Sequence, residues 1–195
     1  YVVTGDAEQS ALAQDVNYLG GKVLRINSDG SIPSDNPFPN SSVYSLGHRN
    51  SFGFTFHPDT NDLWQTENGP TTDDEVNRII AGGNYGWPIV TGIANNPSYI
   101  DPIIAITPNI AVTGITAIPE GSLVYPESYH HNLLFADWNT GKIQRIVLTG
   151  ANLTQLSSLS TAYNGGQGGL LDLEQGLDGY IYVTSFNGGI FKLVM

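Results

Sequence analysis

The sequence has no cysteine, few basic residues and no long apolar run, and each absence removes a class of function. Without cysteine there is no disulfide, no thiolate catalysis and no cysteine-ligated zinc. The 7 Lys and Arg residues against 18 Asp and Glu give a formal net charge of −11, which opposes binding to nucleic acids or anionic membranes. No apolar stretch reaches the roughly 18 residues that would cross a bilayer. We therefore expect no nucleic-acid partner and no membrane span.

Helix-forming stretches are also scarce, whereas turn-forming residues are plentiful. The 23 glycines and 11 prolines are spread along the whole chain, which favours many short strands joined by turns. Amphipathic periodicity of helical length is interrupted everywhere by Gly or Pro, and residues 10–14 have room for one helical turn at most. These features predict an all-β protein and argue against a parallel α/β fold, which needs helices between its strands.

A short signature recurs four times along the chain: a β-branched aliphatic residue, any residue, a basic residue, then Ile or Leu. It occurs at residues 23–26, 76–79, 143–146 and 190–193, with the basic residues Arg25, Arg78, Arg145 and Lys192. This position therefore holds four of the 7 basic residues in the sequence. The alternation predicts one strand per repeat, with the basic side chain on its polar face.

A second apolar strand with an aromatic residue precedes each signature. Tyr1-Val2-Val3, Leu63-Trp64, Leu134-Phe135 and Ile181-Tyr182 are these segments. Turn sequences at residues 58–62 and 177–179 precede two of them, as in a β-hairpin. Each repeat is therefore predicted to be a hairpin followed by a returning strand.

The spacing of the repeats predicts a β-propeller of four-stranded antiparallel blades. We expect residues 1–195 to form a single domain with about three and a half blades: three fairly complete blades after a first one that begins at its third strand. Such a chain is incomplete at its N-terminus. Since the first residue is Tyr and not Met, we expect the missing blades to come from upstream residues, or otherwise from another chain.

Several motifs in this order and spacing resemble the soluble pyrroloquinoline quinone (PQQ)-dependent glucose and aldose sugar dehydrogenases, the glucose/sorbosone dehydrogenase family. They are Gly21-Lys22-Val23-Leu24-Arg25-Ile26, Ser45-Leu46-Gly47-His48-Arg49-Asn50, Glu67-Asn68-Gly69-Pro70, Asp73-Asp74-Glu75-Val76-Asn77 and Gly82-Gly83-Asn84-Tyr85-Gly86-Trp87-Pro88. The likeness covers about ninety residues and then continues only as a blade pattern. It implies the C-terminal part of a six-bladed propeller.

The resemblance implies a cofactor site at Arg49, Asn50 and Asn68. Arg49 and Asn50 would face PQQ, with Asn68 beside them. Arg49 would be catalytic, because a fixed guanidinium can hold negative charge that develops on the quinone oxygens. The alternative is a buried arginine that ties two loops together through a carboxylate.

The resemblance also implies two Ca²⁺ sites. Backbone carbonyls of Gly69 and Pro70 would bind a Ca²⁺ that touches the quinone, whereas Glu75 and the backbone oxygen of Tyr85 would bind a structural one. The alternative for residues 73–75 is a solvated acidic turn.

Three departures separate the chain from the family pattern. The family's proton-abstracting histidine lies upstream of the segment that begins at Tyr1, outside this sequence. We expect His48 to hydrogen-bond locally, and His57, His130 and His131 to be surface residues, with the adjacent pair on opposite sides of a strand. Basic cofactor contacts of the family are unmatched at residues 137–141 and 169–173.

These observations predict an oxidoreductase that oxidises the C1 hydroxyl of a small sugar and passes hydride to PQQ, with Ca²⁺ as a second cofactor. The alternative is a non-catalytic, calcium-stabilised extracellular propeller that acts as a binding or structural module. A propeller hydrolase ranks last, because the acidic residues are scattered. The sequons at Asn40 and Asn152 favour a secreted protein, extracellular or periplasmic.

Overall fold

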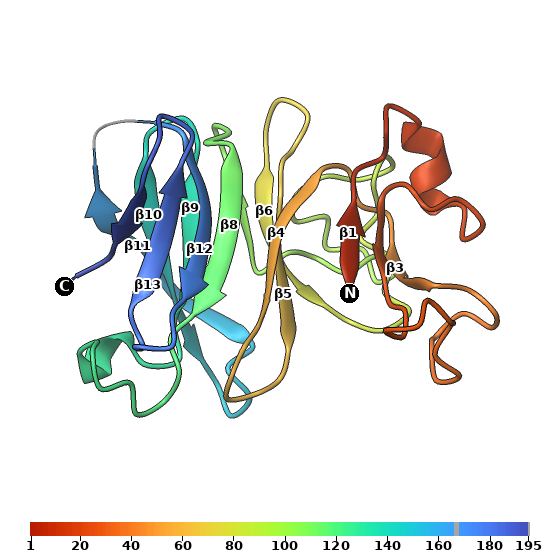
Figure 1. The fold of residues 1–195 in the computed structure, drawn as a ribbon. Coiled ribbons are helices and arrows are strands. Elements are labelled where there is room, and N and C mark those ends of the chain that lie inside the picture. Colours follow the sequence, from red (N-terminus) through yellow and green to blue (C-terminus); the bar gives the residue numbers. More distant parts are fainter. Residues whose placement is uncertain (166–167, 195) are drawn as a thin grey trace.

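The computed structural model describes residues 1–165 and 168–194, which form four antiparallel sheets lying side by side in chain order (Figure 1). The first sheet consists of β1 (Val2–Thr4), β2 (Lys22–Leu24) and β3 (Val43–Leu46), and the second of β4 (Ser51–Phe56), β5 (Leu63–Glu67), β6 (Asp74–Ile79) and β7 (Ile104–Ile106). The third consists of β8 (Val112–Ala117), β9 (Leu133–Asp137), β10 (Lys142–Thr149) and β11 (Gln155–Asn164), and the fourth of β12 (Leu170–Gln175), β13 (Ile181–Ser185) and β14 (Ile190–Lys192).

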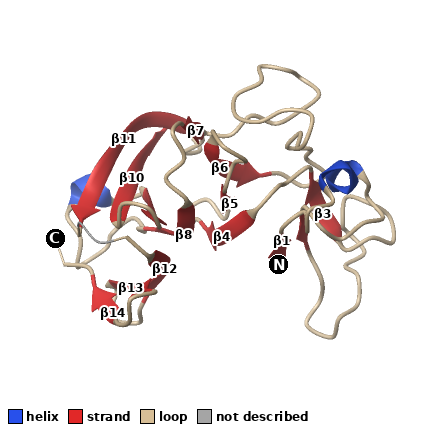
Figure 2. Cartoon of the chain, turned by 90° about the horizontal axis from the view of Figure 1, so that it is seen from above, coloured by secondary structure: helices blue, strands red, loops and turns tan. Residues whose placement is uncertain are grey.

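The sheets form an arc, as Figure 2 shows from above, with β4, β8 and β12 along its inner side and β7 and β11 at its outer side. Packing between neighbouring sheets joins β4 to β8 and β8 to β12. This is the arrangement of successive propeller blades, so the predicted all-β class and its four-stranded antiparallel blades are confirmed. Closure into a ring of six blades stays a prediction.

Buried side chains of β9 show why the sheets stack. Leu133 and Phe135 belong to the apolar cluster between the second and third sheets, whereas Leu134 and Ala136 belong to the cluster between the third and fourth. Successive residues of a strand point to opposite faces, so a strand that is apolar throughout can be buried only between two layers. A third cluster, around Val23 and Leu63, fills the space between the first and second sheets.

The repeat signature marks the third strand of each blade. Arg78 lies opposite Trp64, Arg145 opposite Leu134 and Lys192 opposite Tyr182, in the same register each time. The basic groups are partly exposed and pair with carboxylates of nearby turns: Arg25 with Asp35, Arg78 with Asp62, and Lys192 with Asp178. Arg145 instead lies over the ring of Tyr129, 3.9 Å from its centroid. The basic residue of each signature therefore links the third strand of its blade to a nearby carboxylate or aromatic ring.

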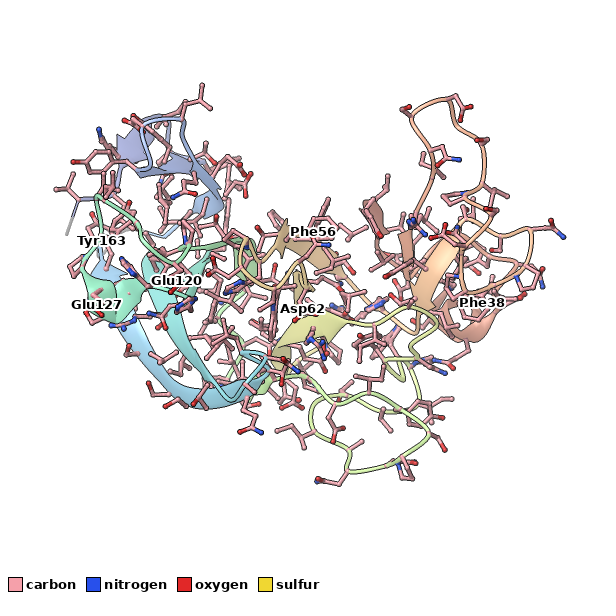
Figure 3. All side chains as sticks on the ribbon, turned by 90° about the horizontal axis from the view of Figure 1, so that it is seen from below. Phe38, Phe56, Asp62, Glu120, Glu127 and Tyr163 are labelled. Carbon is pink, nitrogen blue, oxygen red and sulfur yellow. The ribbon has the colours of Figure 1, made fainter. Side chains whose placement is uncertain are left out.

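The strand count differs from the prediction at both ends of the described chain. The first sheet already begins at its second strand, because β1 pairs with β2 as β5 pairs with β6. The fourth sheet, predicted to be fairly complete, has three strands. On the inner side, Phe52, Phe54 and Phe56 of β4 remain 37–47% exposed, although Tyr1 contacts Phe56 edge-on (Figure 3 marks Phe56).

Helical structure is limited to two short 3-10 helices among the described residues, Ser10–Gln14 as predicted and Glu127–Tyr129. None of the helices in residues 1–165 and 168–194 is long and apolar enough to cross a membrane.

Two expectations about histidines are wrong. His57 is fully buried, and its ring nitrogen Nε2 lies 3.1 Å from the carbonyl oxygen of His131 in the turn before β9. His130 and His131 lie in a turn and not in a strand, since the backbone of His131 has a φ of 61°.

Candidate functional site

Six of the seven residues predicted for the cofactor and metal sites lie at one end of the second sheet, whereas the hydroxyl of Tyr85 reaches the backbone of Arg78 and Ile80 near the other end of β6. Arg49 and Asn50 precede β4, and residues 68–70 follow β5 at the same end, because β4 and β5 are antiparallel neighbours. Glu75 lies at the beginning of β6, opposite Glu67 at the end of β5. The segment that carries Tyr85 returns to this end through a bridge between Asn84 and Leu46.

Arg49 holds the loop after β5. Its Nη1 atom donates hydrogen bonds to the carbonyl oxygens of Asn68 at 2.8 Å and Gly69 at 3.0 Å. Its backbone N–H donates to the carboxylate of Glu67 at 2.5 Å, and its guanidinium lies 5.6 Å from the ring centroid of Trp87. The guanidinium therefore ties the residues before β4 to the loop after β5, but it does so through backbone carbonyls and not through a carboxylate, and Arg49 is only half-buried.

Gly69 is the predicted calcium ligand whose carbonyl already has protein partners. In addition to Arg49, the side-chain amide of Asn109 donates to this oxygen at 3.2 Å. The backbone N–H of Gly69 donates to Asp74 at 3.0 Å, and a Cβ here would lie 2.0 Å from the carbonyl oxygen of Thr72. Only glycine fits this turn. Two donors therefore occupy the Gly69 carbonyl oxygen, and a Ca²⁺ bound to it would have to displace Arg49 or Asn109.

Asn50 and Asn68 differ in how free their side chains are to contact a ligand. Asn50 is exposed and its carbonyl accepts a hydrogen bond from the backbone N–H of Asn68 at 2.9 Å. The side-chain amide of Asn68 donates to the carbonyl of Val112 at 2.9 Å, which fixes it to the inner strand of the third sheet. Asn50 is therefore the freer of the two for contact with a ligand.

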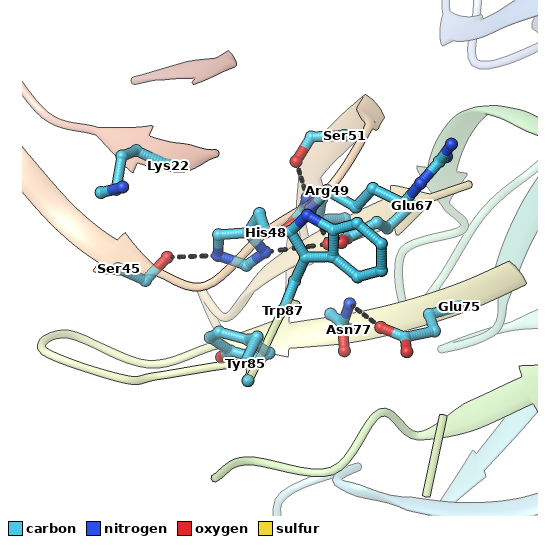
Figure 4. A network of polar contacts seen from close by, with 12 residues as sticks. Lys22, Ser45, His48, Arg49, Ser51, Glu67, Glu75, Asn77, Tyr85 and Trp87 are labelled. Atoms are coloured by element: carbon cyan, nitrogen blue, oxygen red, sulfur yellow. Dashed lines mark hydrogen bonds and ion pairs between the residues drawn. The ribbon is translucent and has the colours of Figure 1, made fainter. Parts of the chain in front are cut away.

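A buried chain of hydrogen bonds runs from Ser45 through His48 to Glu67, whose carboxylate also accepts the backbone N–H of Arg49 (Figure 4). Ser45 and Glu67 flank the ring of His48, at 2.8 Å from Nε2 and 2.9 Å from Nδ1. The ring also stacks on Tyr85, with 4.6 Å between the centroids. His48 does not only bond locally, as expected from sequence, because it reaches Glu67 on the next sheet. Sequence reasoning missed this role of Glu67.

Glu67 and Glu75 form a pair of buried carboxylates across the β5–β6 ladder, 5% and 8% exposed. Burial and the charge of Glu67 raise the pKa of Glu75 to about 8. Its carboxylate accepts hydrogen bonds from the backbone N–H of Gly92 at 2.7 Å and from Asn77 at 3.0 Å. The alternative of a solvated acidic turn is therefore wrong for Glu75.

Oxygen atoms around this pair suit a hard cation. Among the described residues, the side-chain oxygens of Gln65 and Asn77 are buried without a hydrogen-bond donor. A hollow of about 10 Å³ lies beside the carboxylates, and five predicted residues line it: Arg49, Gly69, Pro70, Glu75 and Tyr85. The described chain contains no cluster of three or more Asp, Glu or His side chains suited to a metal, so a cation here would depend on backbone oxygens.

Basic residues other than Arg49 are engaged elsewhere or lie outside this hollow. Lys22 is buried, and its ammonium donates to the carbonyls of Leu12, Ala13 and Gly20 at 2.8–3.2 Å. Burial lowers its pKa to about 8. Residues 137–141 and 169–173, where the family's basic cofactor contacts are unmatched, form the turn after β9 and the start of β12.

Antiparallel blades in a row, with a polar site in the loops at one end, define a protein of the propeller type. The chain belongs to the glucose/sorbosone dehydrogenase family, whose model matches residues 1–192. It is 50% identical over 95 residues to quinoprotein glucose dehydrogenase B of Acinetobacter calcoaceticus, a match covering 47% of this chain and 20% of that protein.

Two solved structures extend the likeness over the fold. One is a putative oxidoreductase (glucose dehydrogenase) of Thermus thermophilus, with a TM-score of 0.83, 37% identity and coverage of 95% of this chain and 55% of that one. The other is the PQQ-bound form of aldose sugar dehydrogenase from Streptomyces coelicolor, with a TM-score of 0.79, 32% identity and coverage of 94% and 51%. The chain thus spans about half of these relatives.

Proposed function

We propose that this chain is part of a sugar dehydrogenase that uses PQQ and Ca²⁺ to oxidise the C1 hydroxyl of an aldose. The observation that carries the proposal is the convergence of Arg49, Gly69, Pro70, Glu75 and Tyr85 on one hollow. Similarity to a quinoprotein glucose dehydrogenase and to a PQQ-bound aldose sugar dehydrogenase supports the cofactor. When bound, the quinone supplies a carbonyl that accepts hydride, and Ca²⁺ polarises that carbonyl.

Arg49 is the residue that would face the quinone. Its guanidinium donates to two backbone carbonyls and lies over Trp87, so it already lies at the hollow before any ligand arrives. Turning from the Gly69 carbonyl toward an anionic ligand would exchange a neutral acceptor for a charged one, which makes a stronger hydrogen bond. The same movement removes one of the two donors that now occupy the Gly69 carbonyl, which would then be open to Ca²⁺ beside the carbonyl of Pro70. Asn50, exposed beside Arg49, adds a neutral donor.

The Glu75 and Tyr85 site fits Ca²⁺ with less rearrangement. A buried carboxylate whose pKa is raised to about 8 lacks a neutralising partner, and a cation in the adjacent hollow would provide it. The buried oxygens of Gln65 and Asn77 lie on the same ladder as Glu67 and Glu75. We assign this position the structural role, because it anchors the segment with Tyr85 to β6.

The described histidines do not supply the base that takes the hydroxyl proton. His48 is buried, and both of its ring nitrogens lie within hydrogen-bond distance of protein oxygens. His57 follows β4, and His130 and His131 precede β9. These three histidines therefore lie at the opposite end of the sheets from Arg49, which precedes β4. The proposed base is therefore not one of these four histidines.

Two sequons, at Asn40 and Asn152, are exposed and support the proposal of a secreted protein, extracellular or periplasmic. A small-molecule sugar is the proposed partner, and upstream residues or another chain would complete the ring.

The experiment is a PQQ titration of the intact polypeptide, with any residues that precede Tyr1, at millimolar Ca²⁺. We expect saturable binding, weakened about tenfold or more in Arg49→Ala, since a hydrogen bond to a charged group contributes about 1.5–3 kcal/mol. Arg25→Ala is the matched control, because its ion pair with Asp35 lies on the exposed surface. Absence of binding by a folded wild-type protein would contradict the proposal and leave the calcium-stabilised binding module.

A further inference from the structure

Lys22 is a buried cation that the proposed chemistry leaves unused. It lies in β2 and is fully buried (Figure 4 marks it). Its ammonium donates to the carbonyl oxygens of Leu12 at 3.2 Å, Ala13 at 2.8 Å and Gly20 at 2.8 Å, which we call the carbonyl cage. No Asp or Glu among the described residues forms an ion pair with this ammonium. Backbone oxygens therefore satisfy its three N–H donors.

The geometry of the carbonyl cage explains why a lysine occupies this position. An ammonium carries three N–H donors on a flexible stem, whereas the planar guanidinium of an arginine cannot point at three oxygens that surround one atom. Burial lowers the pKa of Lys22 to about 8, although the charge of Asp15 acts in the opposite direction. The ammonium is therefore still the main form at pH 7. The carbonyls replace the water around it, as they do around a bound metal ion.

The ammonium closes the loop that joins β1 to β2, residues 5–21. Two of its acceptors belong to the 3-10 helix in the middle of this loop, and the third lies near the end of the loop. The Ala13 carbonyl also accepts the backbone N–H of Gly47 at 3.0 Å. The carbonyl of Gly21 accepts the backbone N–H of His48 at 3.2 Å. The closed loop is therefore fastened to the segment that precedes β4.

Hydrogen bonds from the same loop reach Arg49 and Trp87. The backbone N–H of Asp6 donates to the carbonyl of Arg49 at 2.7 Å, and the indole N–H of Trp87 donates to the Asp6 carboxylate at 2.8 Å. The side-chain amide of Gln14 donates to the Trp87 carbonyl at 2.7 Å. Since the Arg49 guanidinium lies 5.6 Å from the centroid of the Trp87 ring, one loop holds both members of this contact.

We propose that Lys22 is a positioning residue of the cofactor site, whose ammonium serves as an internal cation that orders the loop of residues 5–21. Through this loop, Lys22 sets the positions of Arg49 and Trp87 without touching a ligand. The predicted effect on quinone binding rests on the proposed dehydrogenase function. The predicted effect on the loop does not depend on that function.

The first test needs no quinone and follows backbone hydrogen exchange of the intact polypeptide by mass spectrometry at pH 7. Lys22→Met keeps the length of the side chain and removes its charge and its donors. We expect peptides from residues 5–21 and 46–50 to exchange at least about tenfold faster, because the loss of charged hydrogen bonds favours local opening. Peptides from β9 and β10 should be unchanged. Lys192→Met, which removes a surface ion pair with Asp178, is the matched control and should change neither region.

A rescue experiment tests whether the ammonium itself orders the loop. Lys22→Ala keeps the carbonyl cage and removes the side chain beyond Cβ, which propylammonium matches in length and charge. We expect propylammonium to restore slow exchange in residues 5–21 and 46–50. Propanol at the same concentration, and sodium chloride at the same ionic strength, should not restore it. Lys22→Ala also carries the test if Lys22→Met does not fold.

Quinone affinity connects the loop to the proposed function. In a PQQ titration at millimolar Ca²⁺, Lys22→Met should bind about tenfold more weakly than the wild type, as when a group that orients a ligand-binding residue is lost. Lys192→Met should bind as the wild type does. If the wild type does not bind PQQ, the dehydrogenase function fails, whereas the exchange and rescue results still decide whether Lys22 orders the loop.

Five results would overturn the positioning role of Lys22. Three concern the loop: unchanged exchange in Lys22→Met, equally faster exchange along the whole chain, or rescue of Lys22→Ala by propanol as well as by propylammonium. The fourth is wild-type quinone affinity in Lys22→Met, which would separate the loop from the cofactor site. The fifth is failure of both variants to fold even with propylammonium present, which would make Lys22 a general structural residue.

Discussion

Replacing Glu75 with glutamine should stabilise the calcium-free protein at alkaline pH, although it removes a buried charge. The folded pKa of Glu75 is about 8, against an ordinary value of 4.5. A carboxyl whose pKa is higher in the folded protein than in the unfolded chain destabilises the fold only at pH values at which this carboxyl is ionised in the unfolded chain. The cost is therefore absent below about pH 4.5, grows as pH rises and levels off above about pH 8.

The size of the effect follows from these two values. At about 1.36 kcal/mol for each pKa unit, the cost is about 1 kcal/mol near pH 5.5 and about 4 kcal/mol near pH 8. Glutamine has nearly the same shape and does not ionise, and its oxygen can still accept the backbone N–H of Gly92. Glu75→Gln should therefore remove about 3 kcal/mol of pH dependence between these conditions.

The assay is urea unfolding of both proteins in EDTA at the two pH values, followed by the same measurement with Ca²⁺. Calcium should stabilise the wild type and have little effect on Glu75→Gln. Glu127→Gln, at an exposed residue of a 3-10 helix, controls for loss of one negative charge. If Glu75→Gln is no more stable than the wild type near pH 8 in EDTA, the account of the carboxylate pair is wrong.

Two further substitutions test the packing that supports the site. His57→Ala should lower the free energy of unfolding by about 2–4 kcal/mol, because it empties a buried position and leaves the His131 carbonyl without a donor. His130→Ala, at a partly exposed position, should cost less than half as much, and equal losses in urea unfolding would contradict the burial of His57. Gly114→Ala should lower the thermal midpoint, with a loss of about 1–3 kcal/mol, because its Cβ would lie 2.5 Å from the Asp172 Cα on the next inner strand. An unchanged midpoint would show that β8 and β12 are not this close.

The blade pattern could be predicted from the sequence because its signals are local. The four basic residues alternate with apolar neighbours, and in three of the four repeats this sets both the strand and its register against the second strand. The grouping of Arg49, Gly69 and Glu75 was implied by the family resemblance that the linear motifs carry. The first blade was misjudged because it was predicted to begin at its third strand, although the apolar triplet at Tyr1 precedes the signature as the second strand does in the other repeats.

Contacts between blades could not be predicted in this way. The buried His57 contacts the carbonyl of His131, 74 residues away, and the rings of Trp138 and Phe186 meet although they come from loops of two sheets. Pairing of Glu67 with Glu75 was within reach, because the hairpin register that sets Trp64 opposite Arg78 also sets these carboxylates together. The effect of that pairing on the pKa of Glu75 depends on burial, which needs the covering segment at Tyr85 and Trp87.

The central claim is that a quinone bound near Arg49 accepts hydride from a sugar. The most direct measurement follows the absorbance of PQQ bound to the intact polypeptide at saturating Ca²⁺ after glucose is added. The account predicts sugar-dependent reduction of the bound quinone, slowed at least about tenfold in Arg49→Ala if one charged hydrogen bond is lost. Bound quinone that stays oxidised with every aldose tested would contradict it.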